Sequence, residues 1–184
     1  MNDHEKAGPE QAGPEEAGLK QAGPEEGGPE QAGPEEARPE EAGSEVQARI
    51  KASFERQGLM EHLGAYLTHI GPGRVHIQLP RRPEVTQQHG YFHAGATSSI
   101  ADSAGGYAAF TLFPDDSSVL TVEFKINLLA PAEGDYIEAI GQVLKSGRTL
   151  TVCQLEVFAI HGTQRSLVAA GQQTLICIHN RPDH

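Results

Sequence analysis

Residues 94–112 constrain the fold more than any other stretch, because fourteen of these nineteen residues are Ala, Gly, Ser or Thr and only Asp102 is charged. Small side chains let strands approach a helix closely from every side, and a helix without a polar face is a buried helix. An aspartate is rarely buried without a partner. The stretch therefore predicts a long buried helix, and it makes Asp102 a candidate functional residue.

Residues 1–46 differ in composition from the rest of the chain. They repeat a five-residue unit of the type Ala-Gly-Pro-Glu-Gln and carry 13 acidic and 3 basic residues, against 12 and 11 in residues 47–184. Recurrent Pro and Gly, with almost nothing apolar to bury, predict a disordered acidic tail at 1–46 that packs on nothing. A partner-binding or solubilising arm is the alternative. One folded domain is expected at 47–184.

Charge and cysteine content narrow the class of protein. Residues 47–184 lack the basic stripe that binds phosphates, so no nucleic-acid partner is expected. The uncharged runs on either side of Asp102 are too polar to predict a membrane span, and the N-terminus has no signal-like pattern. Cys153 and Cys177 have neither metal-ligand nor disulfide-framework spacing. We expect a soluble, cytoplasmic protein without a metal or other cofactor.

Hydrophobic periodicity predicts the remaining elements. An amphipathic helix is expected from Ser44, which can cap it, to Gly58, which ends it. Two strands form a hairpin around Gly71-Pro72-Gly73, and four more follow the long helix; the six expected strands are 65–70, 74–79, 119–129, 136–145, 149–160 and 166–178. Short turns between strands indicate an antiparallel sheet, and with the long helix the fold class is α+β.

The strand at 119–129 has the clearest alternation in the chain. Its apolar residues are expected to share one face and its polar residues the other; the apolar set is Leu120, Val122, Phe124, Ile126 and Leu128, and the polar set is Thr121, Glu123, Lys125 and Asn127.

A hairpin, a buried small-residue helix and four antiparallel strands describe the hotdog fold. The segment Gln-His-Gly-Tyr-Phe-His-Ala-Gly at 88–95, with Asp102 nine residues after His93, resembles the phenylacetate-pathway (PaaI-like) acyl-CoA thioesterases. Leu-Thr-Val-Glu-Phe-Lys-Ile-Asn at 120–127 and Leu-Lys-Ser-Gly-Arg-Thr at 144–149 match the later strands of that family. The resemblance covers roughly residues 55–178.

The resemblance implies a role for each matching residue of the helix. Asp102 would act as nucleophile or as general base for water. The helix start at His93, Ala94 and Gly95 would offer a backbone N–H to the thioester carbonyl. The family usually has His-Gly-Gly where this chain has His-Ala-Gly. Because only a backbone N–H is used, Ala94 should serve unless its Cβ obstructs the acyl group.

Further roles are implied outside the helix. Gln87 or Gln88 would help place the water, where relatives often carry Asn, and the hydroxyl of Thr121 would help hold it. Lys145 and Arg148 in the turn between two strands would pair with the phosphates of coenzyme A. The implied substrate is an acyl-CoA, and the implied assembly is a homodimer or a homotetramer made as a dimer of dimers.

The chemical requirements of thioester hydrolysis also predict a homodimer, independently of the family resemblance. A thioester carbonyl needs a donor where oxyanion charge develops and a nucleophile or base opposite it. A helix N-terminus presents unpaired N–H groups, which suits the first need, and the carboxylate suits the second. His93 and Asp102 lie about 13–14 Å apart along one helix, so they cannot both touch one carbonyl. Two chains related by a two-fold axis would bring one helix start to the other chain's Asp102.

Each assignment has a plainer alternative. Asp102 would then only be hydrogen-bonded to strand N–H groups or to Thr121, and His93 would only orient its loop. Gln87 and Gln88 would be ordinary loop residues. The turn that holds Lys145 and Arg148 would be a simple hairpin. His89 with His93 and Asp102 is a poor metal set, because Gly90 lies between the histidines and no fourth ligand is suitably spaced.

These observations predict an enzyme that hydrolyses an acyl-CoA thioester to free acid and coenzyme A at a dimer interface. A non-catalytic acyl-CoA or small-ligand binding module on the same fold is the main alternative. A hotdog dehydratase or hydratase is a third, and the corresponding motif is missing. No Gly-x-Ser-x-Gly, His-Glu-x-x-His or phosphate-loop motif is present to support another hydrolase class.

Overall fold

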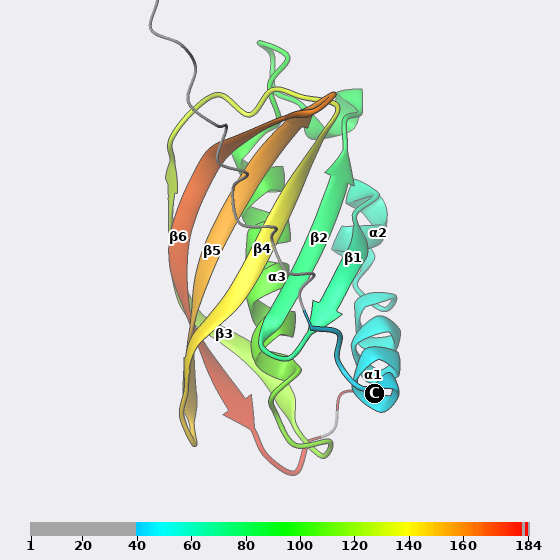
Figure 1. Cartoon of the computed structure of the whole chain (residues 1–184), viewed down its shortest axis with the longest axis vertical. Helices are drawn as coiled ribbons and strands as arrows, with labels where there is room; N and C mark the ends of the chain where they lie inside the picture. The colour runs from blue at the N-terminus through cyan, green and yellow to red at the C-terminus, as the bar shows by residue number, and fades with distance from the viewer. Residues whose placement is uncertain (1–39, 182, 184) are drawn as a thin grey trace, which may run out of the picture. The chain divides into compact units, whose positions relative to one another are not determined.

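The computed structural model describes residues 40–181 and residue 183, so the predicted tail up to residue 39 lies outside the described residues (Figure 1). The elements in chain order are α1 (Ser44–Phe54), α2 (Gly58–Leu63), β1 (Tyr66–Gly71), β2 (Arg74–Pro80), the 3₁₀-helix η1 (Pro83–Val85), α3 (Ala94–Phe110), β3 (Ser118–Leu128), β4 (Tyr136–Ser146), β5 (Leu150–His161) and β6 (Gln164–Ile178).

The strands form one sheet in the order β1-β2-β4-β5-β6-β3, and every neighbouring pair is antiparallel. Figure 1 shows α3 lying along one face of this curved sheet, with α1 and α2 beside β1. The predicted α+β hotdog fold, an antiparallel sheet around one long helix, is confirmed. Over residues 40–181, none of the helices combines the length and apolar character needed to cross a membrane.

Helix α3 is buried because small residues on the helix and on the facing strands allow very close contact between helix and sheet. Ile100, Ala101, Ala104 and Ala108 are fully buried. A Cβ atom added to Gly141 of β4 would lie only 2.3 Å from the backbone oxygen of Ala104. The helix and the strand therefore touch through their backbones, as the small-residue pattern predicts.

The N-terminal part of the domain differs from the prediction. Helix α1 ends at Phe54, and Gly58 begins α2 instead of ending the first helix. Gly43, and not Ser44, is the N-cap residue of α1. Ala42 is buried and its backbone N–H donates to the carbonyl of Ile70 at 2.9 Å, so the folded region begins before residue 47.

Strand β3 corrects the predicted apolar face. Thr121 pairs with Leu175 and Glu123 with Thr174, so Val122 forms a β-bulge. A bulge shifts the alternation by one residue, and Thr121 therefore lies on the same face as Phe124, towards α3. Val119 before the bulge and Ile126 after it both pack against the core, which agrees with the shift.

Strand β3 is also an edge strand, and four of its apolar side chains are exposed. The exposed fractions are 54% for Leu120, 55% for Val122, 42% for Phe124 and 57% for Leu128. A long apolar edge strand is a surface on which another chain can pair.

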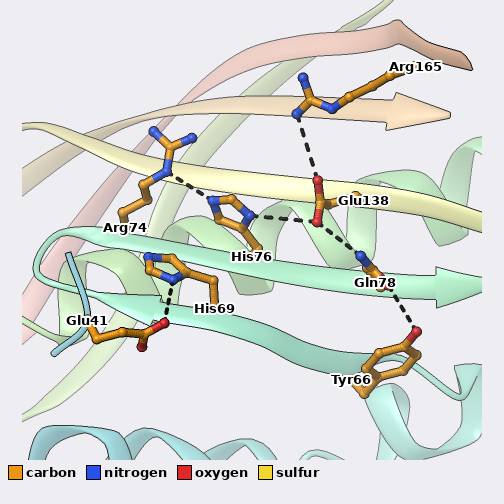
Figure 2. A network of polar contacts seen from close by, with 8 residues as sticks. All are labelled: Glu41, Tyr66, His69, Arg74, His76, Gln78, Glu138 and Arg165. Carbon is orange, nitrogen blue, oxygen red and sulfur yellow. Dashed lines mark hydrogen bonds and ion pairs between the residues drawn. The ribbon is translucent and has the colours of Figure 1, made fainter. Parts of the chain in front are cut away.

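The opposite face of the sheet carries a polar network (Figure 2). Glu138 accepts a hydrogen bond from Gln78 at 3.1 Å and lies 3.6 Å from His76 and 3.7 Å from Arg165. The imidazole of His76 and the amide of Gln78 hold the pKa of Glu138 below its ordinary value of 4.5, although burial opposes the shift. His69, close to His76, contacts Glu41 at 3.1 Å and so ties the chain before α1 to β1.

Candidate active site

Asp102 lies in the middle of α3 with one carboxylate oxygen firmly held. Its Oδ1 atom accepts a hydrogen bond from the hydroxyl of Thr121 at 2.8 Å and from the side-chain amide of Gln173 at 2.6 Å. The side chain is half-buried and borders a hollow of about 340 Å³. The structure thus brings together Asp102 and Thr121, two residues that the sequence predicts for the site.

Gln173 on β6 is a residue of this cluster that sequence reasoning missed. Its neighbours on the α3 face of the strand, Leu175 and Cys177, are apolar and buried, and Gln173 itself is fully buried. An amide at a position where the alternation calls for an apolar residue is the signal that would have marked it.

Another part of the wall of the Asp102 hollow consists of hydrogen-bonded neutral groups, next to the ion pair of Arg56 with Asp183. Tyr107 of α3 accepts a hydrogen bond from Gln57 at 3.0 Å, and its hydroxyl lies 3.2 Å from that of Ser53. Ser103 donates to Gln57 at 3.1 Å. Burial raises the pKa of the Tyr107 phenol above its ordinary value of 10.0.

The start of α3 is formed by His93, Ala94 and Gly95, all exposed. His93 is the N-cap residue, and its Nδ1 atom accepts a hydrogen bond from the backbone N–H of Gly95 at 2.9 Å. Of the predicted N–H donors, the one at Gly95 is therefore occupied by His93. The N–H of Ala94, the first helical residue, has no acceptor among residues 40–181 and remains available to a ligand.

Gln87 and Gln88 lie next to this helix start. Together with His93 and Ala94 they border a second hollow of about 600 Å³. Gln87 is half-buried and its side-chain oxygen accepts a hydrogen bond from the backbone of His89, while its amide nitrogen makes no such contact within the described loop. Gln88 is exposed.

The two halves of the predicted site lie in separate hollows within one chain. Asp102 and Thr121 border the first, together with Val119 and Leu120 from the beginning of β3. Ala94 borders the second, together with residues from the end of β3 and beyond. The separation agrees with the distance expected along one helix.

Lys145 and Arg148 border neither of these hollows. Arg148 lies in the β4–β5 turn, while Lys145 is still part of β4 and pairs with Val152; both are exposed. Leu150, which follows the turn, pairs with Ile176, and Ile176 also pairs with Leu120 of β3. The register therefore puts this turn at the end of the sheet where the Asp102 hollow opens.

Comparison with known proteins identifies the family. Residues 89–166 match the model of the thioesterase superfamily. A thioesterase family protein from Silicibacter pomeroyi is 42% identical in its crystal structure, with a TM-score of 0.71 over 73% of this chain and 98% of that one. A Saccharolobus solfataricus protein provisionally named an esterase is 32% identical over 98 residues, which are 53% of this chain and 69% of that protein.

The E. coli PaaI protein from the phenylacetic acid degradation operon has the same fold. Its TM-score is 0.67 over 74% of this chain and 96% of that one, at 21% identity. The fold and the family match define a hotdog protein, and the chain belongs to the thioesterase superfamily. The predicted likeness to PaaI is confirmed at the level of the fold.

Proposed function

We propose that this protein hydrolyses an acyl-CoA thioester to the free acid and coenzyme A, at a site that two copies of the chain build together. The observation that carries the proposal is the Asp102 carboxylate. One of its oxygens is held by Thr121 and Gln173, while the side chain borders an open hollow. Membership of the thioesterase superfamily supports the same reaction.

The exposed edge of β3 supports the homodimer. Leu120, Val122 and Leu128 are each more than half exposed on β3, whose outer edge pairs with no other strand among residues 40–181. A second copy that pairs its own β3 antiparallel to this edge would extend the sheet across a two-fold axis and cover these side chains. The same surface on both chains would then be buried. Pairing of such dimers into a tetramer is the larger assembly that we propose.

Antiparallel pairing of β3 would also join the two halves of the site. The Asp102 hollow lies at the beginning of β3, with Val119 and Leu120 in its wall, and the helix-start hollow lies at the end of β3, with Leu128 and Leu129 in its wall. In an antiparallel pair the beginning of one strand lies beside the end of the other. Each dimer would therefore contain two sites, each with Asp102 from one chain and Ala94 from the other.

The chemistry at such a site follows from these groups. The Ala94 N–H donates to the thioester oxygen as negative charge develops on it, helped by the positive end of the α3 dipole. Asp102 takes the proton of a water that attacks the carbonyl carbon, or attacks that carbon itself to form an anhydride that water then hydrolyses. The new C–O bond replaces the C–S bond, and the coenzyme A thiolate leaves and takes up a proton.

Four further residues have supporting roles in this proposal. Gln87 and Gln88, beside Ala94, orient the attacking water through their side-chain amides. Lys145 and Arg148, at the end of the sheet where the Asp102 hollow opens, pair with the phosphates of coenzyme A.

The test is thiol release from a panel of aromatic and aliphatic acyl-CoAs by the wild type and by Asp102→Asn. The substitution keeps the shape of the side chain and removes its charge, so we expect turnover to fall by about 10²-fold or more with an unchanged melting temperature. Full activity of Asp102→Asn would refute the proposed mechanism. Binding of acyl-CoA without thiol release by either protein would instead support the non-catalytic binding module.

A further inference from the structure

Gln173 is fully buried beneath α3, 71 positions away from Asp102 in sequence. Its amide nitrogen lies 2.6 Å from Oδ1 of Asp102, 3.0 Å from the hydroxyl oxygen of Thr121 and 3.2 Å from the backbone oxygen of Asp102. The Thr121 hydroxyl accepts from Gln173 and donates to Asp102. Gln173 therefore orients both the carboxylate and the hydroxyl beside it.

The two oxygens of the Asp102 carboxylate differ as a result. Oδ1 accepts from the Thr121 hydroxyl and from the Gln173 amide. Over residues 40–181 no hydrogen-bond donor contacts Oδ2. An oxygen that already accepts two hydrogen bonds is a poorer base and nucleophile than one that accepts none, so Oδ2 is the oxygen that is free to react.

The other end of the Gln173 amide points to the same role. Its carbonyl oxygen is buried without a hydrogen-bond partner in the described part of the chain, which is an unfavourable state for a polar atom. A Cβ on Gly105 would lie 2.0 Å from this oxygen, so the glycine leaves the space that the amide occupies. An apolar side chain would avoid the unpaired oxygen, but it would not donate to Asp102.

We propose that Gln173 is the positioning residue of Asp102. Its amide donates to Oδ1 together with the Thr121 hydroxyl, holds the carboxylate against Thr121 and leaves Oδ2 as the reacting oxygen. The proposal rests on the proposed thioesterase function and adds to it the side chain that sets the orientation of the catalytic group. Gln173 acts through Asp102 and does not touch the substrate.

The test compares Gln173→Met and Gln173→Glu with the wild type in kcat, KM and the pH dependence of kcat/KM. Methionine has a similar length and no donor, so kcat should fall about tenfold or more while KM changes little. The acidic limb of the profile should move to higher pH, because a donor to the charged carboxylate is lost. Glutamate adds a second carboxylate beside Oδ1, and the limb should move further in the same direction.

Gln172 supplies the matched control. It is the neighbouring residue on the same strand, is exposed, and points to the opposite face of the sheet. Gln172→Met and Gln172→Glu should keep wild-type rates and profiles. Acid unfolding of a destabilised variant would also move the limb, so the folded fraction of each Gln173 variant is measured over the same pH range and the rates are divided by it. If one variant yields no folded protein, the other decides.

Three results would distinguish a wrong positioning role for Gln173 from a wrong proposed function. An unmoved acidic limb in a folded Gln173 variant, with Asp102→Asn inactive, would overturn the positioning role and leave the proposed function intact. A lower kcat with an unmoved limb would also overturn it, because it would reflect a merely structural role. Wild-type turnover by Asp102→Asn would instead refute the proposed function itself.

Discussion

Replacing Ala94 by proline would remove one N–H group and almost nothing else. Ala94 is the first residue of α3, where proline is well tolerated because the N–H has no partner inside the helix. The residue before it, His93, has φ −67° and ψ 137°, an extended conformation that suits a residue preceding proline. Ala94 is exposed, so the ring meets little packing resistance within its own chain.

The size of the effect follows from the role proposed for this N–H. Loss of one oxyanion donor costs about 10²–10³ in kcat, or about 2.7–4 kcal/mol of transition-state stabilisation. The free energy of unfolding should change by less than about 1 kcal/mol, since a proline compatible with the native backbone also restricts the unfolded chain. Ala94→Ser, which keeps the N–H, should retain activity. The assays are thiol release for kcat and thermal melting for stability.

Mixing two inactive variants would show whether the site is shared between chains. In a dimer of one Ala94→Pro chain and one Asp102→Asn chain, one active site contains both substitutions and the other contains neither. Random pairing of equal amounts makes half of the dimers mixed, so about a quarter of wild-type activity should return after co-expression. The mixed dimers would be isolated by two different affinity tags.

Two results would refute this reasoning. Wild-type kcat for Ala94→Pro would mean that the Ala94 N–H does not bind the oxyanion. Isolated mixed dimers without activity above that of the separate variants would mean that Asp102 and Ala94 do not act across the interface.

Three other substitutions test the surrounding structure. Gly105→Ala would bring a Cβ to 2.0 Å from the Gln173 oxygen, so it should lower the free energy of unfolding by about 1–3 kcal/mol and reduce kcat. A melting temperature and kcat equal to those of the wild type would contradict this close contact between α3 and Gln173. Val122→Lys should put a charge into the proposed dimer interface and weaken association by about 2–4 kcal/mol, which sedimentation would detect as monomer; an unchanged dimer would argue against pairing through β3. His76 holds the pKa of Glu138 below 4.5, so Glu138 stabilises the fold above that pH and this contribution is lost as pH falls through the folded pKa. Glu138→Gln should therefore cost about 1 kcal/mol in urea denaturation at pH 7 and progressively less in acid, and a pH-independent cost would contradict the assignment.

Much of the fold was predictable because its signals are local. Small residues at 94–112 predict a buried helix whatever else the chain does, and turn residues with alternating apolar side chains predict an antiparallel sheet. The first helix was predicted less well. Gly58 ends a helix by local propensity, but in the structure it begins a second one, since a glycine at such a boundary suits either role.

The candidate site was only partly predictable. Asp102 stands out in the sequence as the single charge in a small-residue helix, and this position predicts its role as nucleophile or general base. The sequence does not distinguish a catalytic from an orienting role for His93, and the structure shows it as the N-cap residue whose Nδ1 accepts a hydrogen bond from the N–H of Gly95. Gln173 was missed, because nothing in the local sequence relates it to a residue 71 positions earlier.

The sequence by itself determined the buried helix and its carboxylate, since side-chain size and charge are properties of each residue. Only the tertiary structure decided what surrounds that carboxylate. Thr121 reaches Asp102 because a β-bulge at Val122 reverses the face on which its side chain lies. A bulge depends on how two strands pair, and pairing depends on contacts between distant segments, so no local pattern could have predicted it. The same packing brings Gln173 to Asp102.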